Sequence, residues 1–326
     1  MANYKKESGI GVKTYSSDPP TSFPSAFEGQ LYYNSSDGSF KFQTLGAGAW
    51  ASATALPAAT NNQAGFGTTT AAVNAGGYTP GGATANVQLY DGSSWTEVNN
   101  TQTTRYAQRG VGTTTAGVMW GGAGLPTPGQ GITEEWDGTN WSEQNDLNTP
   151  RYGTMATGVQ TAAMAGSGVI DPATTVNCET YDGSSWTEIA NVNTARRSPA
   201  GGGTTTAAIL FGGGVPSTAT ADSETWNGTA WTEGNNLNTA RAYAVGTGTT
   251  VPNTMCIGGR PGAKAEVEVY DGTSWTEAAD LSTARGDGAA TGSQAGALCL
   301  GGEPPRTTAV EEWTGESVAA ANVTAS

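Results

Sequence analysis

The side chains that could carry out chemistry are few, because this chain of 326 residues contains no histidine. Without histidine, Ser-His-Asp and Cys-His catalysis and most zinc and copper sites are excluded. A pair of carboxylates could still hydrolyse a glycoside. However, the glutamates recur two residues after a tryptophan, as Glu97, Glu143, Glu188, Glu233 and Glu277. Residues that return once per repeat usually belong to a scaffold, so we expect no enzyme, no cofactor and no metal site.

Five arginines share a second recurring position, ten residues after a tryptophan. They are Arg105, Arg151, Arg196, Arg241 and Arg285, and the first repeat has Thr60 there instead. Two interpretations stay open. The arginines are struts between repeats, whose guanidinium groups satisfy loop carbonyls or the glutamate that follows the tryptophan. Alternatively, they form a ring of positive charge that binds an anionic sugar or an ion.

Three cysteines, Cys178, Cys256 and Cys299, are too few and too far apart for a disulfide framework. Cys256 and Cys299 each stand two residues before a Gly-Gly pair. We interpret them as small buried hydrophobic residues on neighbouring strands. A metal pair is the alternative, although no third or fourth soft ligand accompanies them.

The elements that position these residues follow from a repeat of about 45 residues. One tryptophan recurs at nearly equal intervals of 45, 46, 45, 45 and 44 residues and marks the repeat, as Trp50, Trp95, Trp141, Trp186, Trp231 and Trp275. Before this tryptophan, Tyr90-Asp91-Gly92 and its copies predict tight hairpins, because glycine accepts the positive φ of such turns. Further upstream, five of the six repeats have an apolar strand closed by Gly-Gly.

Four antiparallel strands at this period, called a, b, c and d within each repeat, make one blade of a β-propeller. We therefore expect an all-β, six-bladed propeller over residues 51–326, with tryptophan and tyrosine rings between neighbouring blades. Residues 29–50 form a β-hairpin or a partial blade, which leaves seven blades as the alternative. The 48 glycines and the low content of charged residues, 13%, agree with short strands and turns.

The net charge of −14 disfavours nucleic acid and anionic membrane surfaces as partners. No apolar run approaches the ~20 residues that span a bilayer. The first residues lack the apolar stretch of a signal peptide, so we expect synthesis in a cytoplasm.

In a four-stranded meander, the b–c loops and the d–a crossovers between blades emerge on one face. The b–c loops differ in length and sequence between repeats, over residues 78–85, 123–131, 167–175, 214–221, 260–264 and 303–308. Binding sites usually lie on variable loops held by a rigid scaffold. We expect a ligand to meet this face, with Tyr78, Arg260 and Arg306 as candidate contacts.

The Gly-Gly at the end of strand b, the aromatic residue before a tight turn and the tryptophan soon after it resemble the kelch repeat over residues 51–326. The short c–d turn and the threonine-rich a–b turn depart from the kelch pattern. The resemblance implies a binding propeller. Kelch-like oxidases hold copper through histidine, so that branch is excluded.

Residues 1–28 are predicted to be an extended docking arm with Pro19, Pro20, Phe23, Pro24 and Phe27 as contacts. This arm, followed by Glu28-Gly29-Gln30-Leu31-Tyr32-Tyr33-Asn34, resembles the N-terminal part of tail fibres and other bacteriophage virion proteins. The blades resemble tryptophan-rich repeats in structural proteins of marine phages, especially those infecting cyanobacteria.

The resemblance implies a homo-oligomeric virion protein, made in the host cytoplasm. Its arm would bind other virion proteins, and its loop face a host-surface glycan or receptor. One alternative is a purely structural capsid decoration or a collar or fibre-joint protein. A cellular kelch-like adaptor or lectin is another.

Overall fold

The computed structural model describes residues 13–15 and 31–322, apart from 125–128 and 216–217. Within these residues the chain is built from β-strands, and the one helical element is a short 3-10 turn, η1 (Val251–Asn253). No helix in the described part is long and apolar enough to span a membrane. Two compact units divide the chain, one at Ala49–Thr314 and the other combining Met1–Gly48 with Gly315–Ser326.

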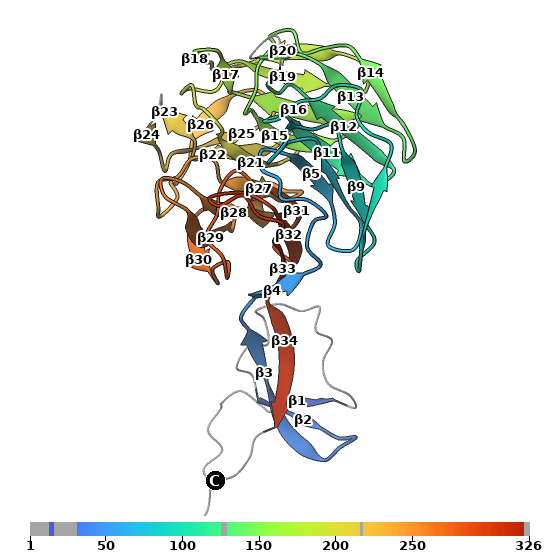
Figure 1. Ribbon diagram of the computed structural model, residues 1–326. Coiled ribbons are helices and arrows are strands. Elements are labelled where there is room, and N and C mark those ends of the chain that lie inside the picture. The colour runs from blue at the N-terminus through green and yellow to red at the C-terminus, as the bar shows by residue number, and fades with distance from the viewer. Residues whose placement is uncertain (1–12, 16–30, 125–128, 216–217, 323–326) are drawn as a thin grey trace, which may run out of the picture. The chain divides into compact units, whose positions relative to one another are not determined.

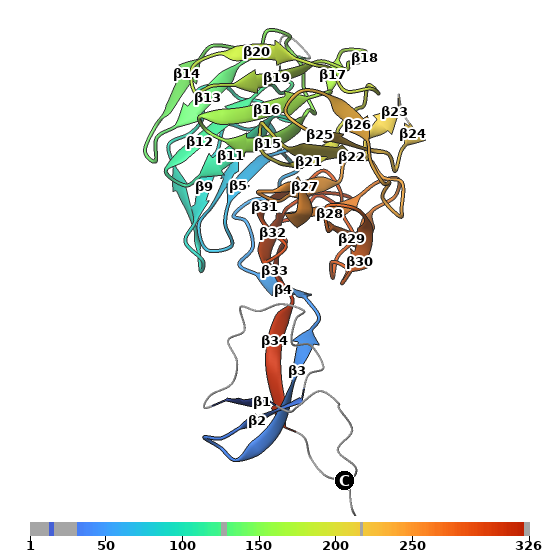
Figure 2. The ribbon, with the colours of Figure 1, turned by 180° about the vertical axis from the view of Figure 1, so that it is seen from behind.

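The larger unit is a β-propeller of six four-stranded antiparallel blades, which confirms the expected fold and shows that the seven-blade alternative is wrong. Figures 1 and 2 show the six sheets arranged around a common centre. From the inner strand a to the outer strand d, blade 1 is β5 (Ala64–Gly67), β6 (Ala72–Ala75), β9 (Val87–Tyr90) and β10 (Trp95–Val98), and blade 2 is β11 (Arg109–Thr113), β12 (Ala116–Trp120), β13 (Thr133–Trp136) and β14 (Trp141–Gln144). Blade 3 is β15 (Met155–Val159), β16 (Ala162–Gly166), β19 (Cys178–Tyr181) and β20 (Trp186–Ile189), and blade 4 is β21 (Ala200–Gly203), β22 (Ala208–Phe211), β25 (Ser223–Trp226) and β26 (Trp231–Glu233). Blade 5 is β27 (Val245–Thr247), β28 (Thr254–Gly259), β29 (Lys264–Tyr270) and β30 (Trp275–Ala278), and blade 6 is β31 (Ala289–Ser293), β32 (Gly296–Leu300), β33 (Val310–Thr314) and β4 (Ala49–Ala53).

The outer strand of blade 6 comes from the N-terminal side of the propeller. Trp50 on β4 lies opposite Trp313 on β33, in the register that Trp141 and Trp136 have in blade 2. Trp50 is therefore the recurring tryptophan of the last blade, and β4 closes the ring. The propeller thus begins at residue 49 and ends at residue 314, not at the expected 51 and 326.

The second unit contains one four-stranded sheet in the order β1 (Lys13–Tyr15), β2 (Leu31–Asn34), β3 (Ser39–Gly46) and β34 (Ser317–Asn322). The hairpin expected within residues 29–50 is present as β2 and β3, and its turn uses Gly38 at a φ of 72°. The chain end contributes β34, which pairs antiparallel with β3.

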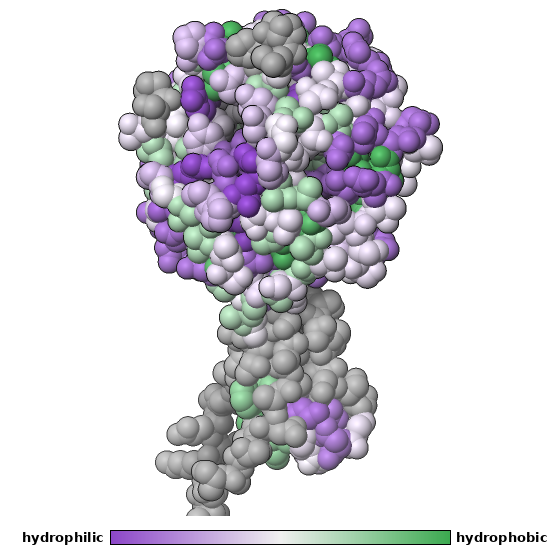
Figure 3. All heavy atoms as spheres, viewed as in Figure 1, coloured by the Kyte–Doolittle hydropathy of each residue, from purple (hydrophilic) through white to green (hydrophobic). Residues whose placement is uncertain are grey.

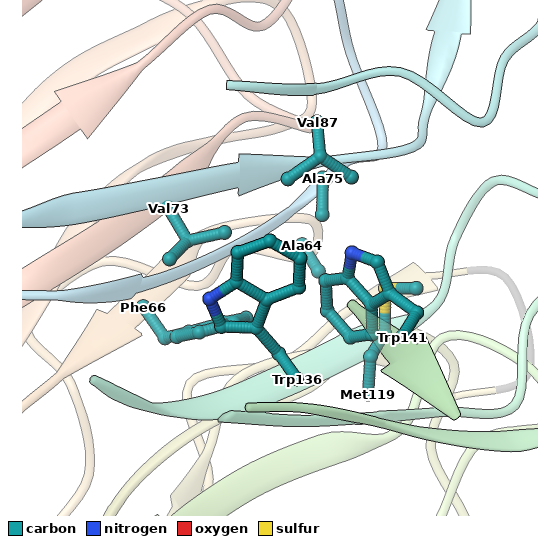
Figure 4. Close-up of a cluster of buried hydrophobic side chains, with 8 residues drawn as sticks. All are labelled: Ala64, Phe66, Val73, Ala75, Val87, Met119, Trp136 and Trp141. Carbon is teal, nitrogen blue, oxygen red and sulfur yellow. The ribbon is translucent and has the colours of Figure 1, made fainter. Parts of the chain in front are cut away.

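Aromatic side chains fill the space between neighbouring blades, as the sequence predicts. In Figure 4, Trp136 and Trp141 of blade 2 pack on Phe66 and Val73 of blade 1, together with Met119 and alanine and valine side chains. The Nε1 of Trp136 donates to the carbonyl of Thr114 at 2.8 Å, so its polar atom stays satisfied. The six buried clusters each combine residues of two adjacent blades, including blade 6 with blade 1, so burial holds the ring shut.

Glycine lets the inner strands approach one another at the centre. A Cβ on Gly201 would lie 2.2 Å from Cγ of Met155, and one on Gly246 would lie 2.4 Å from the carbonyl oxygen of Gly201. The inner strands therefore need glycine where blades converge, and this accounts for part of the high glycine content.

A closed ring of six backbone hydrogen bonds links all blades just before their inner strands. Its N–H groups donate to the preceding member over 2.6–3.3 Å, in the order Asn62, Ala107, Gly153, Ser198, Tyr243 and Asp287, and Asn62 donates back to Asp287. All six residues have left-handed φ angles of 46–58°. These positions thus hold neighbouring crossovers together on the loop side of the propeller.

Candidate functional site

The loop face, formed by the b–c loops and the d–a crossovers, is the place where sequence reasoning expects a ligand. In each blade a crossover residue forms an isolated antiparallel bridge with the first residues of the b–c loop, as Asn61 does with Tyr78. Three of these loops carry short hairpins, β7 (Tyr78–Thr79) with β8 (Gly82–Ala83), β17 (Val169–Ile170) with β18 (Ala173–Thr174), and β23 (Gly214–Val215) with β24 (Thr218–Ala219). The two sets of loops therefore share one face.

The five crossover arginines do not form an open ring of charge at this face. Arg105, Arg151, Arg196 and Arg241 are 0% exposed and Arg285 is 2% exposed. Each pairs with a glutamate on strand c of the blade that it enters, Glu134, Glu179, Glu224, Glu268 or Glu311. Of the two interpretations, the accessible ring is wrong. The arginines are struts, but their carboxylate partner is the glutamate on strand c and not the one on strand d that the sequence suggested. The glutamates of strand d, such as Glu188, are exposed.

Each strand-c glutamate also holds the crossover that carries its arginine. The backbone N–H of Gln102 donates to Glu134 at 2.7 Å, and that of Asn148 donates to Glu179 at 2.7 Å. Arg105 donates in addition to the carbonyl of Gly121 at 3.1 Å. A buried carboxylate that accepts from both a guanidinium and the backbone fixes the entry of each blade.

Blade 1 replaces both members of this pair. Thr60 stands at the arginine position and Gln88 at the glutamate position, and both are buried. The amide of Asn74 donates to Gln88 at 2.7 Å. Since a single buried charge without a partner is costly, loss of both charges together agrees with a structural role.

The three loop residues singled out from the sequence lie in one contact network. The guanidinium of Arg306 lies over the ring of Tyr78 at 5.1 Å. Arg306 also lies 3.9 Å from Glu303, whose other carboxylate oxygen pairs with Arg260 at 2.6 Å. Asp287 completes the network, with its Oδ2 2.6 Å from Nε of Arg260. We call Tyr78, Arg260, Asp287, Glu303 and Arg306 the loop-face cluster.

The loop-face cluster combines aromatic and charged groups that solvent reaches. Tyr78 is 38% exposed, and the side chains of Arg260, Glu303 and Arg306 are 24–31% exposed. Tyr106 packs its edge against Tyr78 with ring centroids 5.2 Å apart. Such a surface can stack on an apolar ring face and hydrogen-bond to polar substituents around it.

Sequence reasoning missed Asp287 and Glu303: Glu303 connects the two arginines, and Asp287 pairs with Arg260. Glu303 begins a loop that the sequence marked as variable, and Asp287 lies in the crossover that enters blade 6. The contacts of both carboxylates with these arginines depend on how blades 5 and 6 meet. No local sequence motif predicts such contacts.

Burial raises the pKa of the Asp287 carboxyl to about 6, an effect that Glu303 reinforces and Arg260 opposes. The unfolded chain therefore releases this proton at lower pH than the folded protein does, and stability falls as pH rises from about 4 to 6. We expect Asp287→Asn to remove this loss of stability, which is about 3 kcal/mol. Melting temperatures of the wild type and of Asp287→Asn between pH 4 and 7 test this. All other carboxylates are the same in the two proteins, so the difference between their curves reports Asp287. Parallel curves would contradict the assignment.

The remaining predicted sites have plain outcomes. The three cysteines are free and buried, and burial raises their pKa, so they behave as small hydrophobic residues. Within the described residues, no cluster of metal-ligating side chains is found. Pro19, Pro20, Phe23, Pro24 and Phe27 of the predicted docking arm lie outside the described residues.

The face seen in Figure 3 mixes hydrophilic and weakly apolar residues over the propeller without a broad hydrophobic area. Recognition by polar and aromatic groups suits such a surface better than an extensive apolar contact.

No protein-family model matches the chain, and no curated protein resembles it significantly.

Proposed function

We propose that this propeller is a binding protein of a bacteriophage virion, and that its loop-face cluster binds a host-surface glycan. The single observation that carries the binding role is the convergence of Tyr78, Arg260 and Arg306, from the loops of three adjacent blades, in one partly exposed network. Sugar rings offer C–H faces to an aromatic ring, and their hydroxyls accept from guanidinium and donate to carboxylate.

The viral setting is supported by the resemblance of residues 1–34 and of the blades to phage structural proteins. The docking arm of residues 1–28 stays a prediction within this proposal, as do its virion partners and a homo-oligomeric state. Several copies on one particle would raise the avidity of a weak single site. Detection of the chain in purified virions tests the setting, and its absence from particles would contradict it.

The binding role is tested with multimerised protein on intact host cells and on immobilised glycans. We expect Tyr78→Ala and Arg306→Gln each to weaken binding about tenfold per site, which corresponds to ~1.4 kcal/mol. Val159→Ala is a matched control, because Val159 is 54% exposed and lies at an a–b turn, on the opposite face.

A purely structural role has an observation of its own in its favour. Arg260 and Arg306 already have carboxylate partners in Glu303 and Asp287, so the cluster is satisfied without a ligand. If multimerised wild-type protein binds neither cells nor glycans, the structural role replaces the binding role. Equal binding by the wild type and both cluster variants would place the ligand elsewhere.

A further inference from the structure

The propeller has a central cavity of about 330 Å³ that the inner strands of all six blades line. Its lining consists largely of glycine, alanine and threonine. Each inner strand is the edge of its sheet, so one row of its backbone N–H and C=O groups has no partner within that sheet. The cavity is therefore polar in its backbone and neutral in nearly all of its side chains.

Arg109 is the only charged side chain among the described residues that line this cavity. The register places it opposite the last residue before Gly-Gly, Trp120. The same position in the other five blades holds an apolar residue, namely Ala64, Met155, Ala200, Val245 and Ala289. Arg109 thus breaks the repeat at a position that the fold fills with hydrophobic side chains.

Arg109 differs from the crossover arginines in its partners. Its Nη1 donates to the carbonyl of Gln108 at 3.0 Å. Within the described residues it has no ion pair at 4.0 Å or less, and Asp287, which pairs with Arg260, acts on its charge from a longer distance. Burial lowers the pKa of Arg109, which nevertheless keeps its charge at neutral pH. A guanidinium with several free donors, only partly exposed and without a carboxylate in direct contact, is an arrangement that an anion would stabilise.

We propose that the central cavity binds a small, singly charged carboxylate through Arg109. The planar guanidinium matches the two oxygens of a carboxylate in a bidentate pair. One cation in a neutral lining balances one negative charge, and the net charge of −14 on the whole chain opposes a multiply charged anion. Arg109 does not belong to the loop-face cluster, although Asp287 of that cluster acts on its charge, and the test of this site does not depend on the proposed glycan binding.

Ligand-observed NMR on the full chain tests the proposal, with acetate and glucuronate as probes and acetamide and methyl glucoside as neutral counterparts. We expect saturable binding of both carboxylates and none of the neutral compounds. Arg109→Met and Arg109→Ala introduce residues that other blades hold at this position, and we expect them to weaken carboxylate binding at least about tenfold. Arg197→Met is the control, since Arg197 does not line the cavity.

Thermal unfolding separates a binding role from a structural one. In buffer without carboxylate, Arg109→Met should unfold at the same or a higher temperature than the wild type, because it removes a partly buried charge that has no ion-pair partner. Acetate should raise the melting temperature of the wild type and of Arg197→Met only. A lower melting temperature of Arg109→Met without acetate, unchanged acetate binding in that variant, equal binding of chloride, or no binding by the wild type would each overturn the proposal.

Discussion

Replacing Glu179 by alanine is expected to destabilise the propeller by about 3–5 kcal/mol, because Arg151 would stay buried without its carboxylate. Both side chains are fully buried, so water cannot substitute for the lost partner. The change also removes the acceptor of the Asn148 N–H, which donates to Glu179 at 2.7 Å. Urea-induced unfolding followed by tryptophan fluorescence measures the loss.

Glu188→Ala is the matched control for this experiment. Glu188 lies opposite Glu179 on the neighbouring strand of the same blade, yet it is exposed. We expect this change to alter stability by less than about 0.5 kcal/mol. A similar effect of the two substitutions would show that the Arg151–Glu179 pair is not what holds the crossover into blade 3.

Removing β4 is expected to lower the melting temperature of the propeller by about 10 °C or more. The relevant comparison is between fragments 49–314 and 54–314, which differ by the five residues of β4. Without β4, the buried ring of Trp313 loses Trp50, whose centroid lies 5.5 Å away, and β33 becomes an unpaired edge. Loss of such packing and of a strand ladder costs on the order of 4 kcal/mol or more.

The full chain provides the reference for these fragments. Fragment 49–314 should melt close to the propeller transition of the full chain, since it contains the whole compact unit. Fragment 54–314 should also self-associate, because an open edge strand pairs with other chains. Equal melting temperatures of the two fragments would mean that β4 does not close the ring.

Much of the fold could be predicted because each blade repeats the same local sequence motifs. The Asp-Gly turns and the Gly-Gly pairs each involve a few residues, and the tryptophan spacing repeats them at a fixed period. They can therefore be recognised in each repeat separately. The alternation of variable and constant loops likewise predicted which face would carry Tyr78, Arg260 and Arg306. Neither inference required knowledge of which blades are neighbours across the closure.

Partners that are far apart in the chain could not be predicted in this way. The arginines could be recognised as a set, but the sequence offered several carboxylates and did not distinguish the exposed Glu188 from the buried Glu179. Burial of the arginines depends on where strand c of the entered blade lies. Only the packed structure could decide between a charged ring and buried struts.

The sequence by itself determined the repeat, the strand type and the propeller architecture, because those properties depend on local turn chemistry and periodic burial. It left six and seven blades open, and the pairing of β4 with β33 decided for six. Ring closure decided the rest: it joined Trp50 to Trp313, brought Tyr78 beside Arg306, and enclosed Arg109 in the central cavity. These contacts join residues from different blades, often from opposite ends of the chain. They exist only once the blades are packed around a common axis, which no local pattern encodes.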